Sequence, residues 1–282
     1  MPILTPAEAL CKRDELIELG YAIVPGVLQN PLLDELRAWS DDVFERLPVD
    51  PKYRYQGSDI HVSTERLWNT QPDQQANERH FADPIVEKII DDPAQREACR
   101  LLQLEGLEAR DIIILLSKPA YGPPLYWHQD YMNWNSPEAA TPWPTVIFLS
   151  YYLSDTRREN GCLRAIPGSH RKRIAMHDIL PNAHSPEIQA IDDRDSPVFM
   201  DHPDAVDVPL KAGDLIIADA RLLHAAWPNQ TAQRRTLVLA WHAVFPFPGP
   251  PSWWNGPIPD VVRNADPNAT YEATRTPSPY LR

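Results

Sequence analysis

The chain has 282 residues, 43% of them hydrophobic and 23% charged, which is enough for one large domain with a sizeable core. Its formal net charge of −12 argues against a nucleic-acid partner, which would require a basic face. The longest strongly apolar run, 112–116, is far too short to cross a bilayer. The N-terminus lacks a basic segment followed by an apolar one, so we expect no signal peptide.

Proline and cysteine usage narrows the class further. The chain contains 31 Pro, 10 Gly and 9 Trp, a composition that favours long ordered loops with aromatic anchors over disorder. Its three cysteines, Cys11, Cys99 and Cys162, are widely spaced and form no CxxC motif. We therefore expect reduced thiols in a cytoplasmic protein.

The N-terminus predicts a helix followed by a short strand. Thr5 before Pro6 is typical of a helix start, and Gly20 is placed to end that helix. Residues 21–24 have the composition of a strand, and a Pro-Gly pair follows them.

Two further helical stretches are expected before residue 105. A helix is predicted after Pro31, because apolar residues recur there at three- and four-residue steps: Leu33, Leu36, Trp39, Val43 and Leu47. Another covers about 83–103. Between these helices, the aperiodic stretch 50–75 predicts a structured loop.

The second half of the chain has a β-type pattern. Short apolar runs separated by Pro, Gly and Asn turns predict a barrel or sandwich: 112–116, 146–149, 215–218 and 237–241. We expect a single domain over 1–282, mainly β, with N-terminal helices at about 5–103 and a β core at about 110–245.

Two segments stand apart from that β core. The polar, Pro-punctuated stretch 171–206 has the length of a binding loop or lid. The Pro-rich tail 246–282 contains Trp253-Trp254, which we expect to pack over the barrel.

A candidate metal site begins at His128-Gln129-Asp130. Residues i and i+2 of a strand point to the same face, so His128 and Asp130 can bind one ion. Two histidines and one carboxylate on one face of an ion are typical of non-haem Fe(II) oxygenases. A second H-x-D, at His202, contains Pro203, which is poorly suited to an internal strand, and we do not expect it to bind metal.

His224 and Arg235 are the candidate partners of that motif. His224 follows the apolar run 215–218 and would supply the third ligand, although a lone histidine bonded to a backbone carbonyl fits the same pattern. Arg235 begins a predicted strand with apolar residues on its face, so an inward guanidinium would need a carboxylate partner. Alternatively, Arg235 faces solvent and Arg234 faces inward, or either pairs with a protein acid.

Several motifs together resemble the phytanoyl-CoA dioxygenase family of Fe(II)/2-oxoglutarate oxygenases, which includes ectoine hydroxylase. The matching pieces are Gly20–Gly26, Trp127-His128-Gln129-Asp130, Glu159–Leu163, Ile166–His170, Ala212-Gly213-Asp214, His224 and Arg235. The resemblance implies a double-stranded β-helix (jelly-roll, cupin-like) core flanked by helices. It also implies a hydroxylase that uses Fe(II), 2-oxoglutarate and O2 and releases succinate and CO2.

The resemblance also implies roles for individual residues. His128, Asp130 and His224 would bind the iron, Arg235 would bind the distal carboxylate of 2-oxoglutarate, and Gln129 would contact the same co-substrate. His170 is interpreted as structural. Ala226 departs from the family, in which a serine often holds the co-substrate carboxylate at that position. The retained carboxylate of Asp130 favours hydroxylation over halogenation, while desaturation or ring closure would use the same ligands.

The substrate is predicted only as a class, a small metabolite or natural-product intermediate. Aromatic residues that could line its pocket or pack in the core lie beside or after the metal motif and in the early loop: Trp127, Tyr131, Trp134, Trp143, Tyr53, Tyr55 and Trp68. Two other classes remain open: a metal-dependent cupin-like isomerase or hydrolase that needs no 2-oxoglutarate, and a catalytically silent binding protein on the same barrel.

Overall fold

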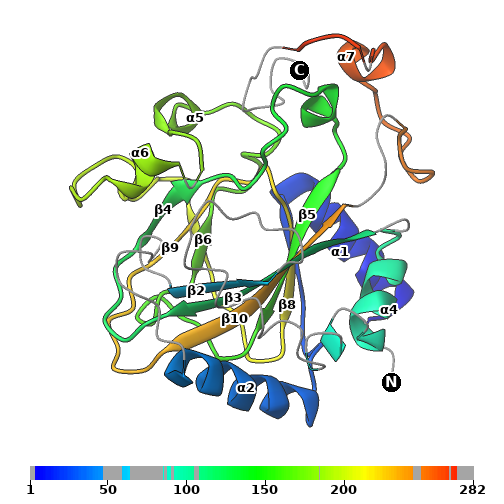
Figure 1. Cartoon of the computed structure of the whole chain (residues 1–282). Coiled ribbons are helices and arrows are strands. Elements are labelled where there is room, and N and C mark those ends of the chain that lie inside the picture. The colour runs from blue at the N-terminus through cyan, green and yellow to red at the C-terminus, as the bar shows by residue number, and fades with distance from the viewer. Residues whose placement is uncertain are drawn as a thin grey trace.

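Two antiparallel β-sheets face each other, and helices cover the outer face of the larger one (Figure 1). The computed structural model describes the residue ranges 4–46, 59–63, 85, 88–89, 92–104, 108–183, 185–243, 249–266 and 268–271. Side chains are described for these ranges except at 59–63, 108–114, 189 and 238–243. The sandwich of two sheets with flanking helices is the predicted jelly-roll core.

The N-terminal helices begin and end where local chemistry requires it. Helix α1 (Pro6–Leu19) starts at Thr5, whose side chain and that of Glu8 cap each other's backbone N–H groups. It ends at Gly20, whose φ of 91° is the left-handed conformation that closes many helices. The other long helices are α2 (Leu32–Arg46) and α4 (Pro93–Leu101), the latter capped by Asp92.

The larger sheet has six strands in the order β1-β8-β5-β10-β3-β2. The strands are β1 (Tyr21–Val24), β2 (Asp59–Ser63), β3 (Glu108–Lys118), β5 (Val146–Tyr152), β8 (Leu215–Asp219) and β10 (Arg235–Ala243). Strand β2 lies in a segment predicted to be a loop, and that prediction was wrong. Its apolar residues alternate with polar ones over five positions, and pairing with β3 stabilises it as the edge strand.

The smaller sheet has four short strands in the order β4-β9-β6-β7. These are β4 (Leu125–His128), β6 (Leu163–Ala165), β7 (Val206–Val208) and β9 (His224–Ala226). A register shift between Leu125 and His128 places two residues of β4 opposite a single residue of β9. Such a bulge re-aims the side chains that follow it.

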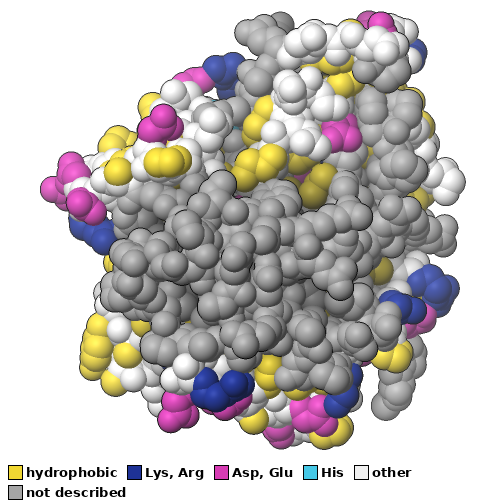
Figure 2. Space-filling model, in the orientation of Figure 1, with side chains coloured by type: hydrophobic (Ala, Val, Ile, Leu, Met, Phe, Trp, Pro, Cys, Tyr) yellow, Lys and Arg dark blue, Asp and Glu magenta, His cyan; other side chains and the backbone are white. Residues whose placement is uncertain are grey.

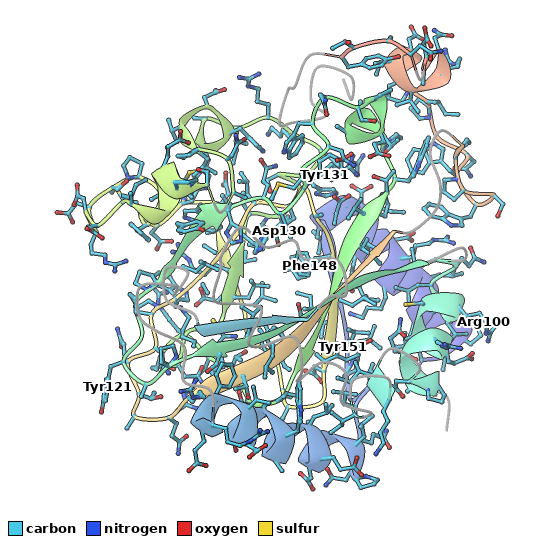
Figure 3. All side chains as sticks on the ribbon, viewed as in Figure 1. Arg100, Tyr121, Asp130, Tyr131, Phe148 and Tyr151 are labelled. Atoms are coloured by element: carbon cyan, nitrogen blue, oxygen red, sulfur yellow. The ribbon has the colours of Figure 1, made fainter. Side chains whose placement is uncertain are left out.

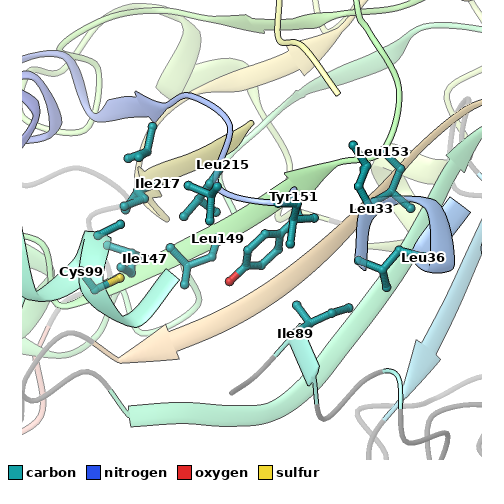
Figure 4. Packing of buried hydrophobic residues seen from close by; sticks show 14 of the residues in the cluster. Leu33, Leu36, Ile89, Cys99, Ile147, Leu149, Tyr151, Leu153, Leu215 and Ile217 are labelled. Atoms are coloured by element: carbon teal, nitrogen blue, oxygen red, sulfur yellow. The ribbon is translucent and has the colours of Figure 1, made fainter. Parts of the chain in front are cut away.

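Strand alternation divides the core into two layers. One face of the large sheet packs against the helices, through Ile147, Leu149, Tyr151, Leu215 and Ile217 with Leu33 and Leu36 (Figure 4). The opposite face turns Phe148, Tyr152, Ile216 and Ala218 toward Leu163 and Ala165 of the small sheet. Burying each large apolar side chain contributes about 1.5–3 kcal/mol, so both layers stabilise the sandwich.

The stretch 171–206 packs against the outer face of the small sheet. It contains the short helices α5 (Met176–Ile179) and α6 (Pro186–Gln189). Met176, Ile188 and Val198 form a buried cluster with Tyr126 and Trp127 of β4. The Trp127 backbone N–H donates to Val198 O at 2.8 Å, so this part of the segment is fixed to β4. A lid function for it stays a prediction.

The described part of the tail packs near the 3₁₀ helix η4 (Pro137–Ala140). It includes helix α7 (Asp260–Arg263), whose Val262 lies in a cluster with Trp143. The Trp254 ring lies 5.7 Å from that of Trp143, and Trp253 Nε1 donates to Gln103 O at 2.8 Å. The tail thereby joins η4 to the end of α4.

The charged surface residues, the three thiols and the lengths of the helices can be compared with what the sequence predicted. On the face shown in Figure 2, acidic and basic side chains of the described residues lie near one another around the edge. Cys11 is exposed, Cys99 and Cys162 are buried, and all three are free thiols. Within the described ranges, the helices are all too short or too polar to cross a bilayer.

Candidate metal centre

The two histidines of the predicted metal site are cross-strand neighbours. His128 at the end of β4 pairs in register with His224 at the start of β9, and their ring centroids are 4.1 Å apart. The bulge in β4 precedes His128, which allows Trp127 to face the outer cluster and His128 to face the interior. The Phe148 ring packs 5.3 Å from the His224 ring.

Asp130 completes a three-residue cluster. Its Oδ1 lies 3.4 Å from His128 Nε2 and its Oδ2 lies 3.2 Å from His224 Nε2. Ligand atoms of all three residues lie within 4.8 Å of one another, and the three side chains are almost completely buried. Asp130 and Phe148 both lie in the region between the two sheets (Figure 3). Two imidazoles and one carboxylate in this arrangement fit a divalent transition-metal ion.

Backbone carbonyls fix the orientation of both rings. His128 Nδ1 lies 2.9 Å from Tyr126 O, and His224 Nδ1 lies 3.0 Å from Leu222 O. A carbonyl accepts a hydrogen bond, so each Nδ1 carries the proton and each Nε2 presents its lone pair to the cluster. A hydrogen bond to a backbone carbonyl is also what a purely structural histidine would make. At His128 and His224, however, this bond orients Nε2 so that it can bind a metal ion.

The electrostatics of the cluster favour a cation. Burial lowers the pKa of His224, but the neighbouring Asp130 carboxylate and the hydrogen bond that His224 donates to Leu222 O outweigh burial and raise that pKa above its usual value. A proton on His224 takes the place that a metal ion can take, because both are held by the same carboxylate.

A buried ion pair that the sequence analysis missed supports the turn before His224. The Arg221 guanidinium donates to both oxygens of Asp219, at 2.9 and 2.6 Å, and both side chains are 1% exposed. Its remaining donors bond the carbonyls of Ala139, Thr141 and Trp143 at 2.7–3.1 Å. The sequence signal that could have indicated this pair is the spacing of Asp219 and Arg221, two residues apart at the end of the apolar run 215–218.

The same turn holds the residues that follow His128. Gln129 Nε2 donates to Arg221 O at 2.6 Å, and the Tyr131 N–H donates to Ala220 O at 2.9 Å. Asp130 lies between these two anchored residues. The amide nitrogen of Gln129, predicted to contact the co-substrate, is thus bonded to the backbone, and its co-substrate contact stays a prediction.

Arg235 lies inside the sandwich. It is 6% exposed, at the start of β10, with its guanidinium carbon 5.9 Å from the centre of the Tyr152 ring. Arg234 lies on the other face, where it is exposed, stacks on Phe44 of α2 and donates to Ser117 Oγ at 2.8 Å. The alternative orientation, with Arg234 inward, is therefore not the one adopted.

The predicted aromatic residues do not gather in one place. Tyr131 and Trp134 pack edge to face at 4.9 Å, beside Ala139 and Ala220. Trp143 is fully buried against the tail. Trp127 lies on the outer face of the small sheet, where its indole N–H donates to Met200 O at 2.8 Å. Their roles as substrate contacts stay predictions, and the early-loop candidates lie outside the described residues: Tyr53, Tyr55 and Trp68.

The other motif residues have structural surroundings. His170 is buried, and its Nε2 donates to Ile17 O at 2.9 Å beside Gly20, as a structural histidine should. His202 lies in a turn before β7, where its ring accepts a bond from the Asp204 N–H. Ala226 lies in β9, opposite Leu163 of β6, and supplies no hydroxyl.

Comparisons with known proteins give one family model and several relatives. The family model for phytanoyl-CoA dioxygenase (PhyH) matches residues 17–237. An ectoine dioxygenase from Bordetella parapertussis is 26% identical over 201 residues, which are 65% of this chain and 61% of that protein. The chain therefore spans less than two thirds of that relative.

Solved structures show the same fold at lower identity. HygX from Streptomyces hygroscopicus, with nickel and 2-oxoglutarate bound, matches with a TM-score of 0.60 at 17% identity, over 89% of this chain and 88% of that one. SnoN, a non-haem α-ketoglutarate-dependent epimerase from nogalamycin biosynthesis, matches with a TM-score of 0.58 at 21% identity, over 85% and 84%. Since the family model covers most of the sequence and the site residues lie within it, the chain belongs to the phytanoyl-CoA dioxygenase family.

Proposed function

We propose that this protein is an Fe(II)- and 2-oxoglutarate-dependent dioxygenase that hydroxylates an unactivated C–H bond of a small metabolite or natural-product intermediate. The cluster of His128, Asp130 and His224 carries the proposal, because both Nε2 atoms and the carboxylate converge with their orientation already fixed. The family to which the chain belongs supports the same chemistry.

The residues have separate roles in this proposal. His128, Asp130 and His224 would hold the iron, and the iron would supply sites for the 2-oxo acid and O2. Arg235, buried and inward-facing, binds the distal carboxylate, which a guanidinium can hold through two parallel hydrogen bonds. When bound, the iron couples decarboxylation of 2-oxoglutarate to succinate and CO2 with insertion of one oxygen atom of O2 into the substrate.

The protein's part is to position these groups and to keep water away from them. The side chains of His128, Asp130 and His224 are almost completely buried. The 219–224 turn fixes the residues on both sides of Asp130 through hydrogen bonds to Gln129 and Tyr131. No separate general base is needed for this reaction. We place the enzyme in the cytoplasm, because its three cysteines are unpaired.

Hydroxylation is proposed over halogenation because the carboxylate ligand Asp130 is present, which leaves no room for a halide. Desaturation, ring closure and epimerisation use the same ligand set, and a structural relative is an epimerase. The four outcomes differ in product mass: hydroxylation adds one oxygen atom, desaturation and oxidative ring closure remove two hydrogens, and epimerisation leaves the mass unchanged.

The test is a screen of small metabolites with the Fe(II)-loaded enzyme, 2-oxoglutarate and 18O2. We expect succinate release to rise above the substrate-free rate for a true substrate, with one 18O atom in the product and one in succinate. Turnover that continues without 2-oxoglutarate and O2, and that survives Arg235→Ala, would instead establish a metal-dependent cupin-like isomerase or hydrolase.

A further inference from the structure

Strand pairing places a second buried cation beside Arg235. Lys118, the last residue of β3, pairs directly with Arg235 of β10 and is 1% exposed. Directly opposed residues of an antiparallel pair point to the same face, with their Cβ atoms about 4.5–5.5 Å apart. Ser117, the preceding residue, bonds Arg234 on the opposite face, which agrees with Lys118 pointing inward.

This pair of cations has no acid to balance it within the described residues. Lys118 Nζ donates to Pro123 O at 2.8 Å, and the groups that act on Arg235 are the hydroxyl of Tyr152 and the thiol of Cys162. Burial and the nearby Arg235 hold the pKa of Lys118 well below its usual value. Like charges directly opposite each other destabilise a strand pair, and burial increases the cost. An anion bound between Lys118 and Arg235 would offset this repulsion.

The chain makes specific room for the Lys118 side chain. Gly161 has a φ of 85°, and a Cβ there would lie 2.4 Å from Lys118 Cδ and 2.7 Å from Trp227 O. Gly161 belongs to the Glu159–Leu163 motif, to which the proposed function gives no role. Because Gly161 has no Cβ, the aliphatic part of the Lys118 side chain can pass directly over it.

We propose that Lys118 is a second cation of the co-substrate site and binds, together with Arg235, the distal carboxylate of 2-oxoglutarate. This inference rests on the proposed function. One of the three ammonium donors is used by Pro123 O, which leaves two for the carboxylate. A 2-oxo acid without a distal carboxylate gains nothing from Lys118.

The experiment compares wild type with Lys118→Met, which keeps the apolar stem and removes the charge. Lys211→Met, at an exposed lysine paired with Asp155, is the matched control. Fe(II)-loaded protein is titrated anaerobically by calorimetry with 2-oxoglutarate and with 2-oxopentanoate, which lacks the distal carboxylate. We expect Lys118→Met to weaken 2-oxoglutarate binding by roughly 10- to 100-fold, the loss of one charge-assisted contact, and to leave 2-oxopentanoate binding unchanged.

Thermal unfolding of the metal-free protein gives a readout independent of turnover. Without co-substrate, Lys118→Met should melt at or above the wild-type temperature, because an unbalanced buried charge is gone. If Lys118→Met instead melts lower and binds 2-oxoglutarate as tightly as wild type, Lys118 only supports the Pro123 turn and the inference is wrong. Should Lys118→Met not fold, Lys118→Gln, which keeps a donor for Pro123 O, gives the same comparison. Wild-type protein that binds iron but no 2-oxoglutarate overturns the proposed function itself.

Discussion

Replacing Arg221 by Met tests whether the buried Asp219–Arg221 pair holds the metal centre in place. The substitution removes two hydrogen bonds to the Asp219 carboxylate, three to the carbonyls of Ala139, Thr141 and Trp143, and a longer one, 3.5 Å, to the Thr141 hydroxyl. It leaves the buried Asp219 carboxylate with a hydrogen bond from the backbone N–H of residue 221, at 2.9 Å. Breaking a buried pair in this way costs about 3–5 kcal/mol. Typical domains have only about 5–15 kcal/mol of stability, so the variant should fold but unfold easily.

The metal site should weaken together with the fold. Residues 220–222 provide the carbonyls that hold Tyr131 N–H, Gln129 Nε2 and His224 Nδ1. Loss of groups that orient metal ligands typically lowers metal affinity about 10–100-fold. Arg221→Lys keeps the charge beside Asp219 but has fewer donors, and we expect it to lie between wild type and Arg221→Met in both properties.

Urea unfolding and Fe(II) titration, the latter at a temperature where every variant is folded, measure the two effects. Arg263→Met removes an exposed pair with Asp260 and is the control, with an expected change within about 0.5 kcal/mol and unaltered metal affinity. Arg221→Met with wild-type stability and wild-type iron affinity would refute the reasoning. A large loss of stability with unchanged affinity would make the pair structural only.

Three further predictions concern the stability of the fold that supports the site. Burial lowers the pKa of His170 from 6.5 to about 4, so the folded protein holds it neutral where the unfolded chain takes up a proton. Stability should therefore fall by about 3 kcal/mol as pH drops from 6.5 toward 4, and urea midpoints of wild type and His170→Gln should converge over that range. Thr5→Ala should cost about 1 kcal/mol in urea unfolding, since it removes the cap of α1; no loss would show that α1 frays without consequence. Gly213→Ala should lower the melting temperature, because φ is 95° and the new Cβ would lie 2.5 Å from Leu28 O; an unchanged melting temperature would contradict this.

The long β runs and the metal motif could be predicted from the sequence because their signals are local. The apolar runs at 146–149 and 215–218 lie inside β5 and β8, and the predicted helix after Pro31 is α2. The short strands of the smaller sheet were not predictable in the same way. Strands β6, β7 and β9 are three residues long, too short to show a period, and pairing rather than composition makes them strands.

The parts of the site that sequence reasoning missed depend on non-local contacts. Lys118 and Arg235 are more than a hundred positions apart, and only the register of β3 against β10 shows that they are neighbours. Arg221 has one bond partner nearby in sequence and three carbonyls some eighty residues away. The direction of Arg235 was open for the same reason, since it depends on which face of β10 the helices cover.

The most direct test of the central claim is the visible absorption of the purified protein after anaerobic addition of Fe(II) and then 2-oxoglutarate. We predict a weak, saturable charge-transfer band, typical of an iron-chelated 2-oxo acid, in wild type and none in His128→Ala. The absence of a band from folded wild-type protein with iron bound would contradict the 2-oxoglutarate-dependent function and favour the metal-dependent cupin-like alternative.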